Sequence, residues 1–210
     1  MAVLLLPGMG ANARMYAEVL AAAGNPSDWR ALDWTDHRGC ATLPELAGRM
    51  QEIHAIGTGD ILVGSSLGGM VACEIAAQLN RRPVVLIGSC HRPDAIPTRV
   101  LAAWAAGWMR PGMLRALGAK GRGSLLARMA AESDPAFIRW SLRALHGWTG
   151  VPASALARIH SIHGLLDPLI PCHRVRPDRI LVGGGHFLAL SHPRQVADFI
   201  MKKVQEIRSI

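Results

Sequence analysis

Six short apolar segments recur along the chain, and each is bounded by Gly, Pro, Asp or another polar residue. They are Val3–Leu6, Ala31–Trp34, Ile61–Val63, Val84–Ile87, Ile159–His163 and Ile180–Val182. Short apolar runs without a regularly alternating polar side are typical of strands that are covered on both faces of a parallel sheet. The fifth run has the weakest strand pattern, because His160 and Ser161 interrupt it.

Helical periodicity fills the intervals between most of these runs. The predicted helices cover Ala13–Ala23, Leu43–His54, Leu67–Leu79 and Pro193–Ile207. Thr42 and Glu45 have the spacing of a capping box at the start of the second helix. Strands that alternate with helices predict an α/β fold, with a mostly parallel, doubly wound sheet of about six strands and right-handed crossovers.

Residues 91–150 interrupt this alternation, since they contain no clear strand pattern. Three or four helices are predicted there, and Asp134 with Pro135 has the pattern of a helix N-cap followed by the first helical position. We therefore expect a core formed by residues 1–90 and 151–210, with an all-helical insertion at 91–150. An insertion beside a sheet is a candidate lid over a site at the strand ends.

Aromatic residues in this insertion have two interpretations. Trp104 and Trp108 lie four residues apart, and Phe137, Trp140 and Ala144 share one face of another predicted helix. Such stripes more often pack against a core than touch a ligand. The alternative is that Trp104, Trp108 and Trp140 line a largely apolar substrate pocket.

Length and composition favour one globular domain, because 210 residues of which 50% are hydrophobic can bury a sizeable core. The start of the chain lacks the pattern of a signal peptide, and no apolar run is long enough to cross a bilayer. We expect a cytoplasmic protein that does not associate with membranes. The four cysteines are far apart and form no CxxC pair, so neither a metal site nor a disulfide framework is expected.

The net charge of +8 is unevenly distributed. Residues 91–150 hold nine Arg or Lys against three acidic residues, a net charge of +6. This segment can attract an acidic partner or an anionic substrate, although arginines solvated on helix faces are the more common explanation of such a charge. No recognised nucleic-acid-binding motif accompanies the charge, so nucleic acid is not an expected partner.

The strongest chemical signal is the sequence Gly64-Ser65-Ser66-Leu67-Gly68, a G-x-S-x-G pattern between a predicted strand and a predicted helix. A serine at such a turn is exposed at the end of the strand, and the flanking glycines keep side-chain bulk out of it. The N-terminus of the following helix favours negative charge that develops during acyl transfer. Ser66 is therefore the predicted nucleophile, with an ordinary Gly-rich turn as the alternative.

A serine hydroxyl needs a base, and the base needs an acid that orients it. His186 follows the last predicted strand in a Gly-Gly-Gly-His sequence and is the predicted base. Asp167 lies beyond the fifth strand and is the predicted acid, although an Asp-Pro pair is also a common turn. Asp94 is the rival acid. Four other histidines fit the role of base less well. His54 lies in a predicted helix, His160 and His163 lie in or at the end of a predicted strand, and His146 lies in the insertion.

Two backbone N–H groups are candidates for an oxyanion hole. One belongs to Leu67, the residue after the nucleophile. The other belongs to Met9, between Gly8 and Gly10, where the backbone can approach a substrate closely. The alternative for this second segment is a simple Gly-rich connection.

Four segments, LPGMG, ILVGSSLGGMVA, HGLLDPLIP and GGGHFLALSHP, resemble the oxyanion loop, nucleophile elbow, acid loop and histidine loop of the α/β-hydrolase superfamily, in the same order. Pro7-Gly8 departs from the His-Gly often found at the oxyanion loop. The resemblance implies a small capped esterase that cleaves a carboxylic ester through an acyl-enzyme, without cofactor or metal.

Two alternatives remain at this point. The chain also resembles small esterases and thioesterases that act on acyl groups held by an acidic acyl-carrier protein, and the basic insertion could attract such a partner. A catalytically idle binding module is the alternative of another class, because fold does not fix function.

Overall fold

The computed structural model describes residues 1–80, 82–98, 100 and 125–209. Its centre is a six-stranded sheet in the order β2-β1-β3-β4-β5-β6, and every neighbouring pair is parallel. The strands are β1 (Val3–Leu6), β2 (Trp29–Ala31), β3 (Ile61–Ser65), β4 (Val84–Ile87), β5 (Ile159–Gly164) and β6 (Arg179–Leu181). The predicted α/β class and the six parallel strands are confirmed.

Two strands lie earlier in the sequence than predicted. The second strand pairs Trp29 with Val3 and Ala31 with Leu5, so it ends where Ala31–Trp34 was expected to begin. Leu32 still donates its N–H to the Leu5 carbonyl, after which the chain leaves the sheet. The apolar residues that suggested a strand are instead used for packing beyond its end. The last strand begins one residue earlier than predicted, at Arg179, which pairs with Ile162.

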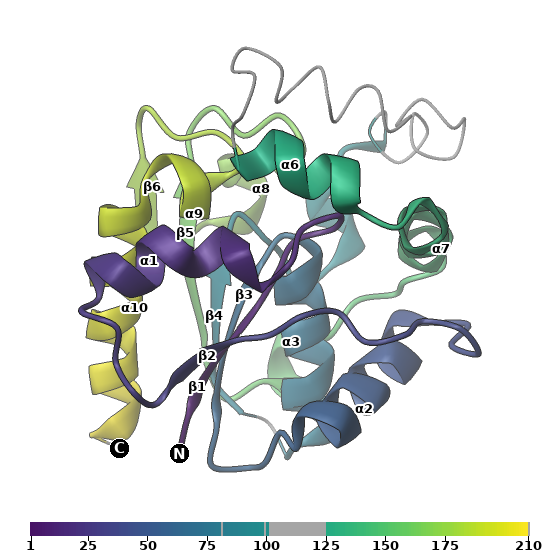
Figure 1. Cartoon of the computed structure of the whole chain (residues 1–210), viewed down its shortest axis with the longest axis horizontal. Helices are drawn as coiled ribbons and strands as arrows, with labels where there is room; N and C mark the ends of the chain where they lie inside the picture. Colours follow the sequence, from purple (N-terminus) through teal and green to yellow (C-terminus); the bar gives the residue numbers. More distant parts are fainter. Residues whose placement is uncertain (81, 99, 101–124, 210) are drawn as a thin grey trace.

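The helices cover both faces of the sheet. They are α1 (Ala17–Ala22), α2 (Leu43–His54), α3 (Leu67–Gln78), α6 (Leu125–Glu132), α7 (Pro135–His146), α8 (Cys172–Val175), α9 (Leu188–Ser191) and α10 (Pro193–Arg208). Short 3₁₀ turns are η1 (Ala13–Tyr16), η2 (Pro93–Ala95) and η3 (Ala153–Ala155). Figure 1 shows α1 and α10 on one side of the sheet and α2 and α3 on the other, which is the doubly wound arrangement.

Alternate strand residues supply two separate buried clusters, because successive side chains of a strand point to opposite faces. Residues packed toward α2 and α3 include Leu4, Leu6, Leu62, Val84 and Leu86. Residues packed toward α1 and α10 include Val3, Leu5, Val63, Val85 and Ile87. Burial on both sides explains why the strands are apolar throughout rather than alternating.

Local capping accounts for two helix starts. Thr42 Oγ1 accepts the Glu45 N–H at 3.4 Å at the start of α2, and the Glu45 carboxylate accepts the Ala41 N–H at 2.7 Å. Asp134 Oδ1 accepts the Ala136 N–H at 2.8 Å at the start of α7. Both N-caps agree with the sequence predictions. The helix predicted at Ala13–Ala23 is divided into η1 and α1.

In the described part of the predicted insertion there are helices and no strand. Helix α6 lies above the end of the sheet opposite the labelled chain termini (Figure 1). Helix α7 packs beside α2, and its Phe137 and Trp140 belong to the same buried cluster as Leu4 of β1. The separation of a cap at 91–150 from the core thus stays a prediction, and α7 shares the core's packing. Trp104 and Trp108 lie outside the described residues.

No helix in the described part of the chain is long and apolar enough to span a bilayer. All four cysteines are free and buried, in agreement with the prediction of unpaired thiols. Within the same described residues, no cluster of His, Cys, Asp or Glu has the arrangement of a metal site.

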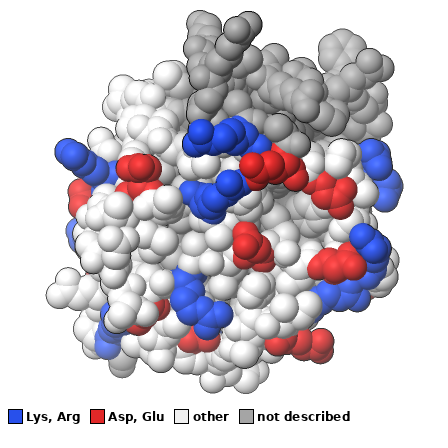
Figure 2. All heavy atoms as spheres, in the orientation of Figure 1, with Lys and Arg blue, Asp and Glu red and all other residues white. Residues whose placement is uncertain are grey.

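The described surface of the insertion does not form a uniform basic patch in Figure 2. Lys and Arg side chains on this face are interspersed with Asp and Glu. Arg14 and Glu132 form one such ion pair. Five of the nine basic residues of the insertion, Arg99, Arg110, Arg115, Lys120 and Arg122, lie outside the described residues.

Two helical glycines provide a matched test of the packing that positions the site. A Cβ at Gly68 would lie 2.3 Å from the Pro7 carbonyl oxygen, whereas a Cβ at Gly48 would lie 3.8 Å from the nearest atom. We predict that Gly68→Ala lowers the free energy of unfolding by ~3 kcal/mol, because backbone must move apart. Gly48→Ala should raise it by about 0.5–1 kcal/mol through helix propensity. Urea denaturation measures both, and wild-type stability of Gly68→Ala would contradict the packing argument.

Candidate active site

Ser66 occupies a sharp turn between β3, which ends at Ser65, and α3, which begins at Leu67. Its backbone angles are φ 51° and ψ −121°, a conformation that a residue with a side chain rarely adopts. Holding such a residue costs on the order of 1–3 kcal/mol and needs support from its surroundings. Ser66 is partly buried. Strain of this kind at a serine between a strand and a helix is typical of a nucleophile elbow.

The glycines of the G-x-S-x-G pattern allow this turn. A Cβ on Gly64 would lie 2.4 Å from the carbonyl carbon of Gly68, and a Cβ on Gly68 would lie within 2.4 Å of the carbonyls of Leu6 and Pro7. The elbow is therefore packed backbone against backbone, both across the turn and against the end of β1. The sequence prediction for these two glycines is confirmed.

Hydrogen bonds with β4, Ser89 and Tyr16 hold the segment around Ser66 in place. The Ser66 N–H donates to the Ile87 carbonyl at 3.1 Å, and the Ser89 hydroxyl donates to the Ser66 carbonyl at 2.6 Å. The fully buried Tyr16 hydroxyl donates to the Leu6 carbonyl at 2.7 Å and lies 3.0 Å from Ser65 Oγ. Burial raises the pKa of Tyr16, so this hydroxyl keeps its proton.

His186 lies within hydrogen-bonding distance of Ser66. Its Nε2 is 2.8 Å from Ser66 Oγ, and its Nδ1 is 2.7 Å from Asp167 Oδ2. The His186 side chain is 6% exposed and that of Asp167 is 0% exposed, so little water competes for these contacts. Residues 120 positions apart are thus joined in one hydrogen-bonded chain from serine through imidazole to carboxylate.

Asp167 is held by further donors. Its Oδ1 accepts the N–H groups of Leu169 at 2.9 Å and Ile170 at 3.0 Å, and His163 Nε2 lies 3.2 Å from Oδ2. Burial alone would raise the pKa of Asp167, but the hydrogen bonds from His163, His186 and the Ile170 backbone outweigh it and hold the pKa well below its usual range. The carboxylate is therefore ionised near neutral pH although it is buried.

The loops that carry Asp167 and His186 are attached to each other. The Leu166 N–H donates to the Gly184 carbonyl at 2.9 Å. A Cβ on Gly164 would lie 2.4 Å from the Gly184 carbonyl oxygen, so these two backbones are in direct contact. Gly164 and Gly184 thus allow the two loops to pack closely against each other.

The rival residues lie elsewhere. Asp94 is paired with Arg92 at 3.2 Å, and its side chain is 65% exposed. His54 Nε2 lies 3.0 Å from the Asp33 carbonyl, and His160 Nδ1 lies 3.7 Å from Asp178. His146 ends α7 and is exposed. Among these candidates only His186 contacts Ser66, and Asp167 contacts His186.

The predicted oxyanion loop follows β1 and approaches the elbow. A Cβ on Gly8 would lie 3.7 Å from Ser66 Cβ. The Gly8 carbonyl accepts the Trp34 indole N–H at 3.1 Å and the Ala11 N–H at 3.1 Å. Within the described part of the chain, the N–H groups of Met9 and Leu67 have no hydrogen-bond acceptor. These are the two groups predicted to form the oxyanion hole.

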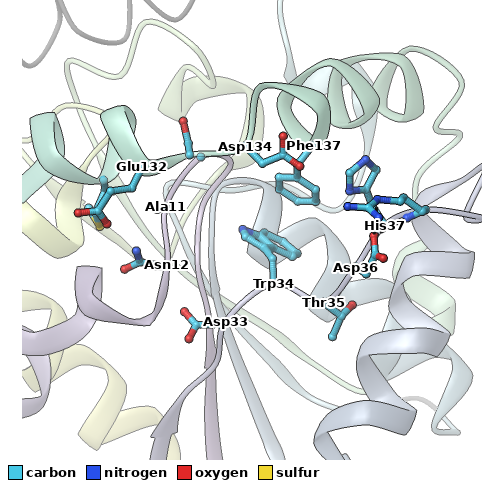
Figure 3. A pocket seen from close by; sticks show the side chains of 14 residues that line it. Ala11, Asn12, Asp33, Trp34, Thr35, Asp36, His37, Glu132, Asp134 and Phe137 are labelled. Atoms are coloured by element: carbon cyan, nitrogen blue, oxygen red, sulfur yellow. Dashed lines mark hydrogen bonds and ion pairs between the residues drawn. The ribbon is translucent and has the colours of Figure 1, made fainter.

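A hollow of about 580 Å³ lies beside this loop. Figure 3 shows Trp34 at its centre, with the segment of Ala11 and Asn12 on one side, Thr35–His37 on another, and Asp134 and Phe137 above. Asp33, Asp36, Glu132 and Asp134 all line it, so its wall combines aromatic rings with carboxylates. The largely apolar pocket expected from the sequence does not describe this hollow.

Trp140 does not line this hollow. Its ring stacks on Phe137 with centroids 5.9 Å apart, and its indole N–H donates to the Cys40 carbonyl at 2.6 Å. Only 7% of the residue is exposed. Trp140 packs behind Phe137, and Trp34 lies in the wall of this hollow. The assignment of Trp140 to the substrate pocket stays a prediction.

A profile described as the alpha/beta hydrolase family matches residues 3–199. The chain belongs to this family. No curated protein sequence matches it.

Solved structures share the fold of this α/β hydrolase. A variant of an N-acyl homoserine lactonase complexed with N-hexanoyl homoserine lactone has a TM-score of 0.76 at 15% identity, covering 100% of this chain and 91% of that chain. A lipase-esterase related protein from Clostridium acetobutylicum has a TM-score of 0.71 at 17% identity, covering 96% and 93%. A thermophilic esterase from Thermogutta terrifontis has 0.65 at 18%, covering 99% and 90%.

Sequence reasoning missed several residues that hold the site of this α/β hydrolase together. Tyr16 and Ser89 support the elbow, Trp34 holds the loop after β1, and His163 contacts Asp167. Only His163 had a signal in the sequence, because His163 and Asp167 are four residues apart at a strand end. The others meet the site through contacts between segments distant in sequence.

The low pKa of Asp167 predicts how stability depends on pH. Because the folded-state pKa lies below that of the unfolded chain, at about 3.9, the ionised carboxylate stabilises the protein above about pH 4. This contribution is lost as the pH falls toward the folded-state pKa. We predict that Asp167→Asn is less stable than wild type at pH 7, by about 1–3 kcal/mol, and that the difference narrows by pH 3.

Urea denaturation at pH 7, 4 and 3 measures this difference. Asp94→Asn is the control, because that carboxylate is exposed, and it should keep the wild-type pH dependence. An equal gap between Asp167→Asn and wild type at pH 7 and at pH 3 would show that the Asp167 carboxylate does not carry this stability.

Proposed function

We propose that this α/β hydrolase cleaves carboxylic esters through an acyl-enzyme, with Ser66 as nucleophile, His186 as general base and Asp167 as the orienting acid. The observation that carries the proposal is the hydrogen-bonded chain from Ser66 Oγ through both nitrogens of His186 to Asp167. A neutral imidazole whose Nδ1–H points at a carboxylate presents an unprotonated Nε2 to the serine hydroxyl. This is the arrangement that accepts a proton as the hydroxyl attacks.

Acylation follows from this geometry. Ser66 Oγ bonds to the ester carbonyl carbon while its proton moves to His186 Nε2, and the carbonyl π electrons move to the oxygen. The resulting imidazolium is stabilised by the buried Asp167 carboxylate. When the tetrahedral species collapses, the C–O bond to the alcohol breaks, and His186 returns the proton to the leaving oxygen.

Deacylation repeats the same steps with water. His186 takes a proton from water, whose oxygen attacks the acyl carbon, and the bond to Ser66 Oγ breaks with return of the proton to the serine. In both halves the negative oxygen needs donors, and we assign them to the N–H groups of Met9 and Leu67. Leu67 is at the N-terminus of α3, where the helix dipole also favours negative charge.

The hollow beside the loop after β1 is the proposed place for one side of the substrate. Gly10 and Trp34 line it, and the Gly8 carbonyl is bonded to Trp34, so the hollow adjoins the loop that faces Ser66. Its carboxylates favour a neutral or cationic group over an anionic one. A small ester or lactone with a polar, uncharged portion fits this chemistry.

Two other readings stay as alternatives. The first alternative is hydrolysis of acyl groups held by an acidic carrier protein, and the positive charge of residues 91–150 supports it. Most of that charge lies outside the described residues. A catalytically idle binding module has the fold without the chemistry. The ordered contact between Ser66 and His186 favours an enzyme over this second alternative.

Hydrolysis of a p-nitrophenyl ester series, from acetate to palmitate, tests the proposed function. We predict measurable turnover by the wild type and a loss of at least about 10³-fold in kcat for Ser66→Ala, because the nucleophile is gone. The chain-length optimum should report the size of the acyl site.

Ser141→Ala is the matched control for this experiment. Ser141 is fully buried in α7, and within the described part of the chain its hydroxyl has no hydrogen-bond partner. Removal of this hydroxyl should therefore leave turnover at the wild-type level. Wild-type activity in Ser66→Ala would exclude Ser66 as the nucleophile. Absence of turnover by the wild type on every ester would overturn the general esterase proposal and favour the carrier-bound substrate or the binding module.

Substitution of Trp34 separates two roles of this side chain. Trp34→Phe keeps a ring in the hollow but removes the hydrogen bond to the Gly8 carbonyl. We predict that kcat falls roughly 2–10-fold with little change in KM, as expected for one lost hydrogen bond that positions the oxyanion donor. Trp34→Ala should also raise KM, because the wall of the hollow is lost. Steady-state kinetics measure both, and an unchanged kcat in Trp34→Phe would exclude a positioning role for the indole.

A further inference from the structure

A second histidine contacts the carboxylate of Asp167. His163 is the penultimate residue of β5, and its side chain is 0% exposed. Its Nε2 lies 3.2 Å from Asp167 Oδ2 and 2.5 Å from the carbonyl oxygen of Ile170. Among the described residues, the polar contacts of His163 are to Asp167 and Ile170 and not to Ser66 or His186, so the mechanism proposed for Ser66 gives this buried side chain no task.

The partners of His163 fix its tautomer. Both neighbours of Nε2 are acceptors, a carboxylate oxygen and a carbonyl oxygen, so Nε2 carries a hydrogen. Nδ1 is buried and has no hydrogen-bond partner among the residues that the structure describes. A proton on Nδ1 would be a buried donor without an acceptor, which is costly. The arrangement therefore suits a neutral imidazole with its single N–H directed at the acid loop.

We propose that His163 is a positioning residue of the catalytic machinery, which acts as a neutral second donor to Asp167 and sets the direction and strength of its hydrogen bond to His186. This inference rests on the proposed function of Asp167 and His186, and it assigns a further residue to the same reaction. His163 acts through Asp167 and touches no reacting atom.

The position of His163 explains why it can do this. The single Nε2–H of His163 lies between two acceptors, the Ile170 carbonyl at 2.5 Å, which is the shorter contact, and Asp167 Oδ2 at 3.2 Å. Asp167 Oδ1 accepts the N–H groups of Leu169 and Ile170, and His186 Nδ1 lies 2.7 Å from Oδ2. The carboxylate is thus held at both oxygens, which fixes its plane relative to His186. A neutral donor orients the carboxylate without cancelling the negative charge that the imidazolium needs.

The other titratable group near Asp167 does not compete for this role. Cys90 follows β4 and interacts electrostatically with Asp167, but burial raises the pKa of its thiol to about 12, so it stays uncharged. The negative charge that faces His186 is therefore that of the Asp167 carboxylate. Its strength depends on the hydrogen-bond donors to Asp167 on β5 and in the acid loop.

Kinetics of three variants test the inference. His163→Leu removes the donor, and His163→Gln keeps an N–H at similar reach. His160→Leu is the matched control, because His160 is buried in the same strand but faces Asp178 at 3.7 Å. The pH dependence of ester hydrolysis and the thermal midpoint are measured for all of them.

We expect His163→Leu to lower kcat by about tenfold and to move the acid limb of the pH–rate profile upward by roughly 0.5–1 pH unit. Loss of one donor makes the carboxylate more basic, so it holds the imidazolium of His186 more strongly. His163→Gln should restore both quantities toward wild type. His160→Leu should leave the acid limb in place, even if it lowers the thermal midpoint.

A purely structural role for His163 would give a lower thermal midpoint with an unmoved acid limb, and that result would overturn the inference. Failure of Gln to restore the profile while Leu shifts it would also count against a donor role. If Ser66→Ala is inactive as expected and the His163 variants match wild type, the inference fails while the proposed function stands.

¹⁵N NMR of the histidine rings in the wild-type protein tests the tautomer of His163 directly and needs no substrate. We expect His163 at pH 7.5 as the neutral tautomer with a protonated Nε2 and an unprotonated Nδ1. The opposite tautomer, or an imidazolium, would overturn the inference even if the Leu variant fails to fold. This readout remains valid if no ester is hydrolysed, so failure of the proposed function is distinguished from failure of the inference.

Discussion

The site depends on the close backbone approach between the nucleophile elbow and the end of β1. Gly68, in the first turn of α3, can lie directly against the carbonyls of Leu6 and Pro7 only because it has no Cβ, and Gly64 allows the turn to fold back on itself. This contact holds Ser66 at φ 51°, and it places the loop that contains Met9 next to the serine. The carboxyl ends of the parallel strands are rigid supports. Gly64 and Gly68 allow the ends of β1 and β3 to lie close enough together to contact the same substrate.

The second requirement is electrostatic, because Asp167 must stay ionised in a buried position. Two backbone N–H groups and the His186 imidazole donate to this carboxylate, and the N–H that His163 shares with the Ile170 carbonyl lies close to it. Together these groups outweigh the cost of removing the carboxylate from water. The loops of Asp167 and His186 are joined through Gly164 and Gly184, so the hydrogen-bonded chain is assembled on one support. A serine hydrolase needs this stable charge at the moment its imidazole becomes positive.

Much of this arrangement could be predicted from local sequence. The strand–turn–helix context located Ser66, and the positions after the last two strands pointed to Asp167 and His186. Contacts between distant segments could not be predicted, since Tyr16, Ser89 and Trp34 carry no motif. His163 was set aside because it ends a strand, although its spacing from Asp167 allowed a contact.

The second strand was predicted too late in the chain because Leu32 and Trp34 are apolar. Apolar residues that pack beyond the end of a strand have the same sequence pattern as the strand itself. The sequence did not decide between packing and a pocket for Trp140, because an aromatic stripe on a helix does not show which side faces a core.

The central claim is that His186 makes Ser66 a nucleophile, and covalent labelling tests it most directly. The protein is treated with a fluorophosphonate at neutral pH, and the modified residue is identified by peptide mass spectrometry. The account predicts one adduct per chain, located on Ser66, and strongly slowed labelling in His186→Ala. Labelling at another residue, or labelling of Ser66 that proceeds at the wild-type rate without His186, would contradict it.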